Sequence, residues 1–467
     1  MGRHGWDARA WRWRLTALLG ASAAVVALLV TLAGTPPGGG ANTEGTSRDG
    51  DKVHGTPATP RALPEPDVGW GFTHTRFSAD VGSPRAVARV EDRLKGARLP
   101  QNQHIMGWGA DNPEPVKGRY DFAALDGRVD FMRASGATPV ITLCCAPDWM
   151  KGGEAGETDW SQEALETAPE PEHYDDFAAL AATVAERYPD VRHFIVWNEF
   201  KGFWNDAAHR WDHEGYTRMY NLVHRALKDV DEDIMVGGPY LVMDSLDPRQ
   251  EHASTSVKGP WGALDQRVLD AFAYWNRHKA GADFVVVDGS SYTRDDELRP
   301  DEFAATAKFT AVGEWVRRQT GGAPPLWWAE YYVEPADADD HRHGWSQARR
   351  TAVQATGMIA MVEGGASSGF YWNPQAERGP ECPGCLWTPT GTADGGGRLP
   401  MYDLLSRFAA AFPPGRAYTG VTADPEVRTL ATDRTILVVN TRDRALSAKV
   451  DGRTVGLQAY EVTWLTR

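Results

Sequence analysis

The chain has 467 residues, of which 42% are hydrophobic and 24% charged, and its formal net charge is -14. This composition is typical of a globular protein with room for one large and one small domain. The negative charge argues against nucleic acid or an anionic membrane surface as a partner, and no sequence feature indicates the oligomeric state. Nineteen tryptophans favour a carbohydrate ligand, because indole rings stack on sugar faces.

The N-terminal residues 1–34 have the pattern of a targeting segment. Four arginines precede an uncharged, apolar stretch at residues 15–34, which is the order found in export signals. The stretch is also long enough to span a bilayer. A cleaved signal peptide and an uncleaved membrane anchor are therefore both open, and each places the rest of the chain outside the cytoplasm. Residues 35–67 are rich in Pro, Gly and Thr and are expected to form a disordered linker.

Between residues 68 and 413, short apolar stretches alternate with amphipathic, helix-like ones. Eight such pairs predict a (β/α)8 barrel, an α/β fold in which parallel strands close on themselves. A doubly wound open sheet is the alternative, but it rarely uses eight units of such regular spacing. The predicted strands cover residues 68–73, 104–108, 138–144, 194–198, 234–238, 283–288, 326–330 and 368–372. The predicted helices cover residues 84–96, 122–135, 171–188, 214–229, 264–278, 302–320, 346–363 and 402–412.

After the barrel, residues 414–467 are expected to form a small accessory domain of β-sandwich type. Short strand-like stretches occur there at residues 428–431, 435–440, 448–450 and 460–465. These residues are too few to build a sandwich with a deep core of its own. The domain is therefore expected to pack against the barrel.

Two of the predicted barrel strands end in a glutamate. The fourth ends in Asn198-Glu199 and the seventh in Ala329-Glu330. Residues at the C-terminal ends of barrel strands face the active site. A retaining glycosidase needs two carboxyl groups there, because one protonates the departing oxygen and the other attacks the anomeric carbon. We therefore predict Glu199 as acid/base and Glu330 as nucleophile. A catalytically silent barrel that binds carbohydrate at the cell surface is the alternative.

Five further residues are candidates for substrate binding. Asn198 is predicted to hydrogen-bond the 2-hydroxyl of the sugar, and Tyr292 to hold the nucleophile ionised and aimed. Trp372 is predicted to form the floor of the sugar subsite, while His104 and Trp204 lie at strand ends or in the following loops. Each also has an ordinary structural interpretation as a turn, core or rim residue.

Four cysteines form two close pairs, Cys144 with Cys145 and Cys382 with Cys385. Adjacent cysteines suit a tetrahedral zinc site badly, so disulfides within or between the pairs are expected in an exported protein. Both pairs are predicted to lie on the face that carries the glutamates, where a bridge between the two loops would stiffen the rim. The chain also lacks phosphate-loop, Gly-x-Ser-x-Gly and His-Glu-x-x-His motifs, and no metal or cofactor is predicted.

Several short motifs resemble clan A glycoside hydrolases, and family 39 most of all. The motifs are residues 197–199 (Trp-Asn-Glu), 203–204 (Phe-Trp), 283–285 (Asp-Phe-Val), 292–293 (Tyr-Thr), 329–331 (Ala-Glu-Tyr) and 370–372 (Phe-Tyr-Trp). The resemblance spans roughly residues 68–372. It implies a retaining hydrolase of polysaccharides or oligosaccharides, in a family that includes β-xylosidases, α-L-iduronidases and exopolysaccharide hydrolases.

Two positions depart from the family pattern. Phe200 stands where a proline usually follows the acid/base, and Ser290 stands where a histidine usually lies two residues before the tyrosine. The serine removes an expected sugar contact, so the resemblance does not by itself imply xylosidase-like specificity. The catalytic pair is unaffected by either change.

Overall fold

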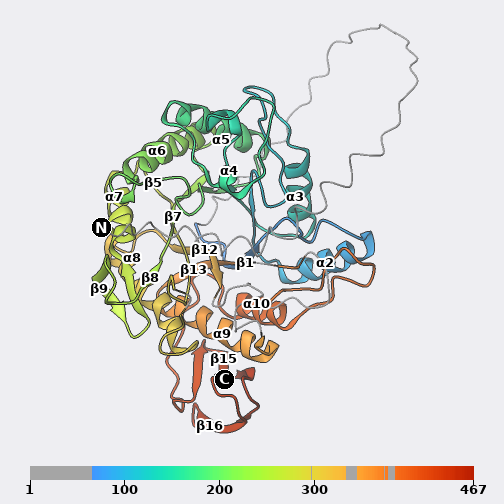
Figure 1. Ribbon diagram of the computed structural model, residues 1–467. Coiled ribbons are helices and arrows are strands. Elements are labelled where there is room, and N and C mark those ends of the chain that lie inside the picture. The colour runs from blue at the N-terminus through green and yellow to red at the C-terminus, as the bar shows by residue number, and fades with distance from the viewer. Residues whose placement is uncertain (1–65, 296, 333–343, 373, 377–383) are drawn as a thin grey trace.

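Eight parallel strands close into a barrel with helices around its outside (Figure 1), which confirms the predicted fold class. The computed structural model describes residues 66–295, 297–332, 344–372, 374–376 and 384–467. The predicted targeting segment and nearly all of the predicted linker lie outside these residues. Within them, no helix combines the length and apolar character that crossing a membrane requires.

The strand order around the barrel is β1-β13-β12-β11-β7-β4-β3-β2. The strands are β1 (Trp70–Thr73), β2 (Gln101–His104), β3 (Pro139–Leu143), β4 (His193–Val196), β7 (Met235–Val242), β11 (Phe284–Ser290), β12 (Leu326–Tyr332) and β13 (Ala366–Tyr371). The main helices are α2 (Pro84–Ala97), α3 (Ala123–Ala134), α5 (Tyr174–Arg187), α6 (His213–Val230), α7 (Gln266–His278), α8 (Ala307–Thr320), α9 (Gln347–Glu363) and α10 (Pro400–Ala411).

Large apolar side chains fill the inside of the barrel. The rings of Phe284 and Trp327 stack with centroids 3.8 Å apart and 17° between their planes, and Phe370 lies beside Trp327. Tyr240 and Ala329 belong to the same fully buried cluster. Aromatic rings of this size pack with little freedom, so the residues at the mouth of the barrel rest on a rigid floor.

The second strand differs from its prediction. It covers Gln101–His104 rather than residues 104–108, and all four of its residues are buried. Asn102 bonds to both neighbouring strands: its amide donates to Thr73 Oγ1 on β1 at 3.2 Å, and the Thr142 hydroxyl on β3 donates to Asn102 Oδ1 at 2.9 Å. The prediction was wrong because it relied on apolar residues to mark a strand. In this strand, hydrogen bonds stabilise buried polar side chains instead.

Several short strands lie outside the barrel and were not predicted. β5 (Trp204–Asn205) and β6 (Arg210–Trp211) form a small hairpin, while β8 (Ser245–Leu246), β9 (Ala253–Gly259) and β10 (Gly262–Asp265) form a three-stranded sheet. Their sequences are short and mostly polar, so they lack the apolar run that marks a buried strand.

The C-terminal residues form two small antiparallel sheets with a core of their own. One contains β14 (Val427–Ala431), β15 (Thr435–Asn440) and β18 (Val462–Thr466), and the other β16 (Leu446–Val450) and β17 (Arg453–Leu457). They lie beside α9 at one end of the molecule (Figure 1). Arg428 on β14 forms an ion pair with Glu363 at the end of α9, with 2.7 Å between nitrogen and oxygen.

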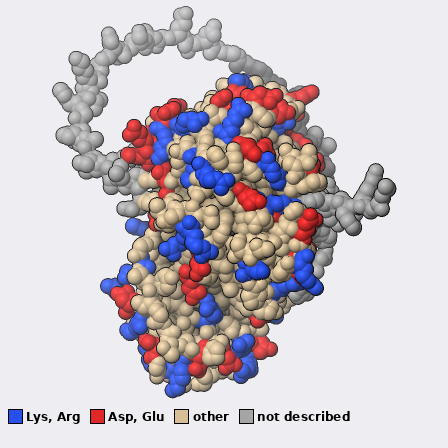
Figure 2. Space-filling model, turned by 90° about the vertical axis from the view of Figure 1, so that its left-hand side faces the viewer, with Lys and Arg blue, Asp and Glu red and all other residues tan. Residues whose placement is uncertain are grey.

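Charged side chains of both signs are interspersed on the molecular face shown in Figure 2. Nucleic-acid-binding proteins instead gather lysine and arginine into a basic patch or stripe. The absence of a nucleic-acid partner stays a prediction from the net charge.

The barrel strands pack so closely at Gly71 that a methyl group has no room there. A Cβ built on Gly71 would stand 1.9 Å from the Pro100 carbonyl oxygen, whereas one on Gly456, also within a strand, would meet nothing within 4 Å. We expect Gly71→Ala to lower the free energy of unfolding by about 1–3 kcal/mol through overpacking, and Gly456→Ala to leave it nearly unchanged. Urea unfolding of both variants tests this, and equal midpoints would contradict it.

Candidate active site

Three carboxylates meet at the C-terminal mouth of the barrel. Oxygen atoms of Glu199, Asp288 and Glu330 all lie within 4.8 Å of one another. Asp288 on β11 is in register with Glu330 on β12, and both are buried. The structure thus brings the two predicted glutamates together. It also adds Asp288, which was predicted as the end of a strand and not as a site residue.

The two glutamates reach the mouth from different kinds of backbone. Glu330 lies within β12, two residues before its end. Glu199 lies beyond β4, which ends at Val196, in a tight turn with a positive φ of 53°. Neither glutamate is therefore the last residue of its strand as predicted, although both lie at the predicted end of the barrel.

A buried cation accompanies the carboxylates and was missed in the sequence. Lys201 Nζ lies 3.2 Å from Glu199 Oε2 and 3.7 Å from an oxygen of Glu166. Glu166 ends α4 (Gln162–Glu166), a short helix in the connection between β3 and α5. Burial raises the pKa of Glu166, although the charge of Lys201 opposes that rise. The one sequence signal for Lys201 was its place two residues after the predicted acid/base.

His104 and Trp372 form one wall of the site together with Trp108. The ring of His104 tilts against Trp108 with centroids 4.6 Å apart, and Trp372 meets both rings edge-on at 6.4 and 6.5 Å. Burial, followed by the charge of Lys201, lowers the pKa of His104 to about 3, so its ring is neutral at ordinary pH. The side chain of the buried Asn198 lies close enough to His104 for a hydrogen bond, which partly opposes the lowering of this pKa.

A tyrosine beneath the carboxylates was also missed. Tyr240 on β7 is wholly buried, and burial followed by the charges of Glu330, Asp288 and Glu199 raises its pKa well above the usual value. Tyr292, the tyrosine predicted to hold Glu330, is buried just after β11, where its main-chain carbonyl accepts a hydrogen bond from Ser245 Oγ at 3.4 Å. Its contact with Glu330 stays a prediction.

Trp204 lies on the hairpin of β5 and β6. Its ring meets Trp211 edge-on at 5.2 Å, the Arg267 guanidinium lies 5.2 Å from its centroid, and its Nε1 donates to Asp206 Oδ1 at 3.1 Å. These contacts give Trp204 a packing role on the hairpin, and its predicted contact with substrate remains untested.

The predicted bridge between the two cysteine pairs is wrong. Cys144 and Cys145 are bonded to each other at the end of β3. A sulfur atom forms one disulfide, so neither cysteine is left to join the loop that follows β13. Cys385 is also disulfide-bonded, whereas Cys382 lies outside the described residues.

The three carboxylates also have the spacing of oxygen ligands for a hard cation such as Ca²⁺. Among the residues that the structure describes, no other group of acidic, histidine or cysteine side chains has this spacing. The sequence prediction of a site without a metal or cofactor stays a prediction.

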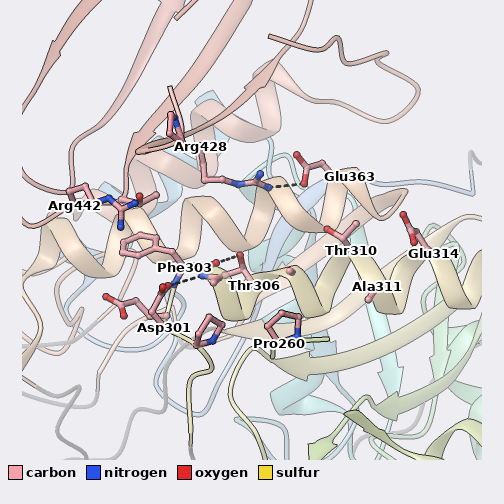
Figure 3. Close-up of a pocket in the computed structure, with 16 residues that line it drawn as sticks. Pro260, Asp301, Phe303, Thr306, Thr310, Ala311, Glu314, Glu363, Arg428 and Arg442 are labelled. Atoms are coloured by element: carbon pink, nitrogen blue, oxygen red, sulfur yellow. Dashed lines mark hydrogen bonds and ion pairs between the residues drawn. The ribbon is translucent and has the colours of Figure 1, made fainter. Parts of the chain in front are cut away.

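A cavity of about 770 Å³ lies away from this mouth, between α8, the end of α9 and the C-terminal sheets (Figure 3). Its lining includes Phe303 and Thr306, which lie just before α8, and the ion pair of Arg428 with Glu363. The carboxylates of the barrel mouth do not line this cavity. It is therefore a separate feature of the contact between the barrel and the C-terminal sheets.

Fold and site together define a (β/α)8 barrel with clustered carboxylates at the C-terminal ends of its strands, an arrangement found in many barrel enzymes. Residues 107–261 match the model of glycosyl hydrolases family 39. This match confirms the resemblance to that family inferred from the sequence motifs.

Known relatives agree with this match. The β-xylosidase of Geobacillus stearothermophilus is 29% identical over 130 residues, which are 27% of this chain and 25% of that enzyme. The chain thus matches about a quarter of the length of this curated relative.

Two solved structures share the fold at low sequence identity. A monomeric β-xylosidase from Caulobacter crescentus CB15 aligns with a TM-score of 0.52 and 19% identity, over 80% of this chain and 73% of that one. SrfJ from Salmonella typhimurium aligns with a TM-score of 0.57 and 14% identity, over 86% and 90% of the two chains. At these identities the likeness establishes the fold.

The neutral, buried His104 predicts that acid weakens the fold. Its folded pKa of about 3 lies below the unfolded value of 6.5, so the unfolded chain binds the extra proton. The stability from this residue is complete above pH 6.5 and is lost as the pH falls toward 3. We expect His104→Gln to reduce the slope of unfolding free energy between pH 4 and 6 by about 1.4 kcal/mol per pH unit. Equal slopes for the variant and the wild type in urea titrations would contradict this.

Proposed function

We propose that this chain is an exported, retaining glycoside hydrolase that cleaves a polysaccharide or oligosaccharide. The observation that carries the proposal is the approach of Glu199 and Glu330, whose oxygens lie within 4.8 Å at the mouth of a (β/α)8 barrel. The match to family 39 over residues 107–261 supports the same class of reaction.

The spacing of the carboxyl groups favours retention over inversion. Retaining enzymes hold their two carboxyl groups about 5–5.5 Å apart, whereas inverting enzymes leave about 6.5–9.5 Å so that a water molecule fits between sugar and base. An oxygen of Glu199 lies within 4.8 Å of an oxygen of Glu330, which is closer than inverting enzymes hold their carboxyl groups. A covalent glycosyl-enzyme is therefore the intermediate that fits this site.

In the proposed reaction, Glu330 attacks the anomeric carbon while Glu199 gives its proton to the departing oxygen. The glycosyl group is then bound to Glu330 as an ester. In the second step Glu199 takes a proton from water, and that water breaks the ester and releases the sugar with its original configuration. Tyr240 beneath the carboxylates is a further candidate to orient Glu330.

Buried polar groups support sugar binding beside the carboxylates. His104 and Asn198 lie next to each other and are buried, and sugar hydroxyls can both donate to and accept from such groups. The rings of Trp108 and Trp372 lie next to His104 and offer apolar surface for a sugar face. Xylosides are the first substrates to test, because the named relatives include β-xylosidases.

The proposed location outside the cytoplasm rests on the N-terminal sequence. Residues 1–34 carry arginines ahead of an apolar stretch, and both a cleaved signal and a retained anchor export the rest of the chain. Fractionation of cells that express the full chain, followed by N-terminal sequencing of the mature protein, distinguishes the two. Recovery from the cytoplasm would contradict export.

A 2-fluoro glycoside with an activated leaving group should label Glu330. The fluorine slows both steps, so the ester accumulates and mass spectrometry of a proteolytic digest locates it. Glu330→Gln should give neither label nor turnover, because the amide is no nucleophile. If a panel of fluoro-glycosides labels no residue while sugars still bind, the chain is the silent carbohydrate-binding barrel instead.

The effect of removing the general acid should depend on the leaving group of the substrate. We expect Glu199→Gln to reduce kcat/KM by about 10²–10⁴-fold on substrates with a sugar leaving group, since general acid catalysis contributes about that much. A dinitrophenyl glycoside needs no proton to depart, so its glycosylation step should be nearly unchanged. An equal loss on both substrates in steady-state assays would remove Glu199 from the acid role.

A further inference from the structure

The turn that carries Glu199 also carries Lys201 into the site. The main-chain N–H of Lys201 donates to the Asn198 carbonyl at 3.0 Å, and Trp197 Nε1 donates to the Lys201 carbonyl at 2.8 Å. Phe200, which stands in place of the family proline, is buried with its ring stacked on Tyr216 at 3.9 Å. The residue between acid/base and lysine thus anchors the turn in the core.

Lys201 is held between two carboxylates from different loops. Its Nζ lies 3.2 Å from Glu199 Oε2, 3.7 Å from Glu166 Oε1 and 5.5 Å from the centre of the Trp108 ring. Its side chain is 2% exposed. An ammonium group so far from water costs free energy unless anions surround it, so these two carboxylates are the reason that Lys201 can lie there.

Lys201 keeps its charge in this setting. Burial opposes ionisation, but the carboxylates of Glu199, Glu166 and Glu330 outweigh it, so that the pKa of Lys201 is raised. The titratable groups that face Glu199 come from six elements of the fold. They are Lys201 from the same turn, Glu166 from α4, Asp288 from β11, Glu330 from β12, Tyr240 from β7 and His104 from β2.

We propose that Lys201 is a positioning residue that orients Glu199 and assists its release of a proton, while Glu166 restrains Lys201 from the other side. This inference rests on the glycosidase function proposed above.

The charge of Lys201 acts on the first step of the proposed reaction. When Glu199 gives its proton to the glycosidic oxygen, the C–O bond breaks and a carboxylate remains, which the ammonium 3.2 Å away stabilises. If the ammonium of Lys201 attracted the Glu199 carboxylate too strongly, Glu199 would lose its proton before substrate binds. Glu166 also attracts the Lys201 ammonium and so weakens its attraction to Glu199. Removal of Glu166 should strengthen the attraction between Lys201 and Glu199, whereas removal of Lys201 should abolish it.

The test compares variants with opposite expected effects. In Lys201→Met, which keeps the length but not the charge, the alkaline limb of kcat/KM on an aryl glycoside should move to higher pH by about one unit. In Glu166→Gln, the same limb should move to lower pH. Lys228→Met is the matched control. Lys228 Nζ lies 2.9 Å from Asp283 Oδ2, and this ion pair is at the opposite end of the barrel from the carboxylates, because Asp283 directly precedes β11. The alkaline limb of kcat/KM of this control variant should stay at the wild-type pH.

The outcomes separate this inference from the proposed function. Turnover by the wild-type enzyme tests the function, and the directions of the two shifts test Lys201. Titration of the Glu199 carboxyl by ¹³C NMR, assigned by its loss in Glu199→Gln, should give the same opposite shifts without any substrate. Shifts in one direction for both variants, or no shift in either, would overturn the inference. If Lys201→Met does not fold, the shift in Glu166→Gln decides alone.

Discussion

Repulsion between like charges is the constraint on which the rest of the site depends. Glu199, Asp288 and Glu330 bring their oxygens within 4.8 Å of one another, where carboxylate charges repel one another strongly. The fold has to offset this cost. Lys201 contributes a buried positive charge next to Glu199, and the closed ring of strands prevents the carboxylates from moving apart.

The barrel has a rigid interior, whereas its mouth is built from variable connections. Stacked rings such as Phe284 and Trp327 fill the barrel below the carboxylates, and this packing leaves little freedom for the strands that carry them. The connections after the strands supply charged groups of the site, among them Lys201 and Glu166. Barrel enzymes commonly change their chemistry in these connections while the strands stay the same.

Local sequence signals predicted what depends on local physics. The Val-rich strand β11 and the amphipathic helices show their periodicity directly, and eight such units indicated a closed barrel. The same signals failed for β2, where Gln101 and Asn102 are buried through hydrogen bonds with distant residues. They also failed for the sheet of β8, β9 and β10, whose short polar strands have no apolar run to detect.

The sequence alone determined the order of the units, the presence of a glutamate near the end of the fourth and seventh strands, and the resemblance to family 39. These follow from residue type and spacing along the chain. Tertiary structure alone decided that Asp288, Glu166 and Tyr240 gather around those glutamates. The reason is that closure of the barrel brings together residues far apart in the chain, and the spacing of residues along a sequence carries no measure of that distance.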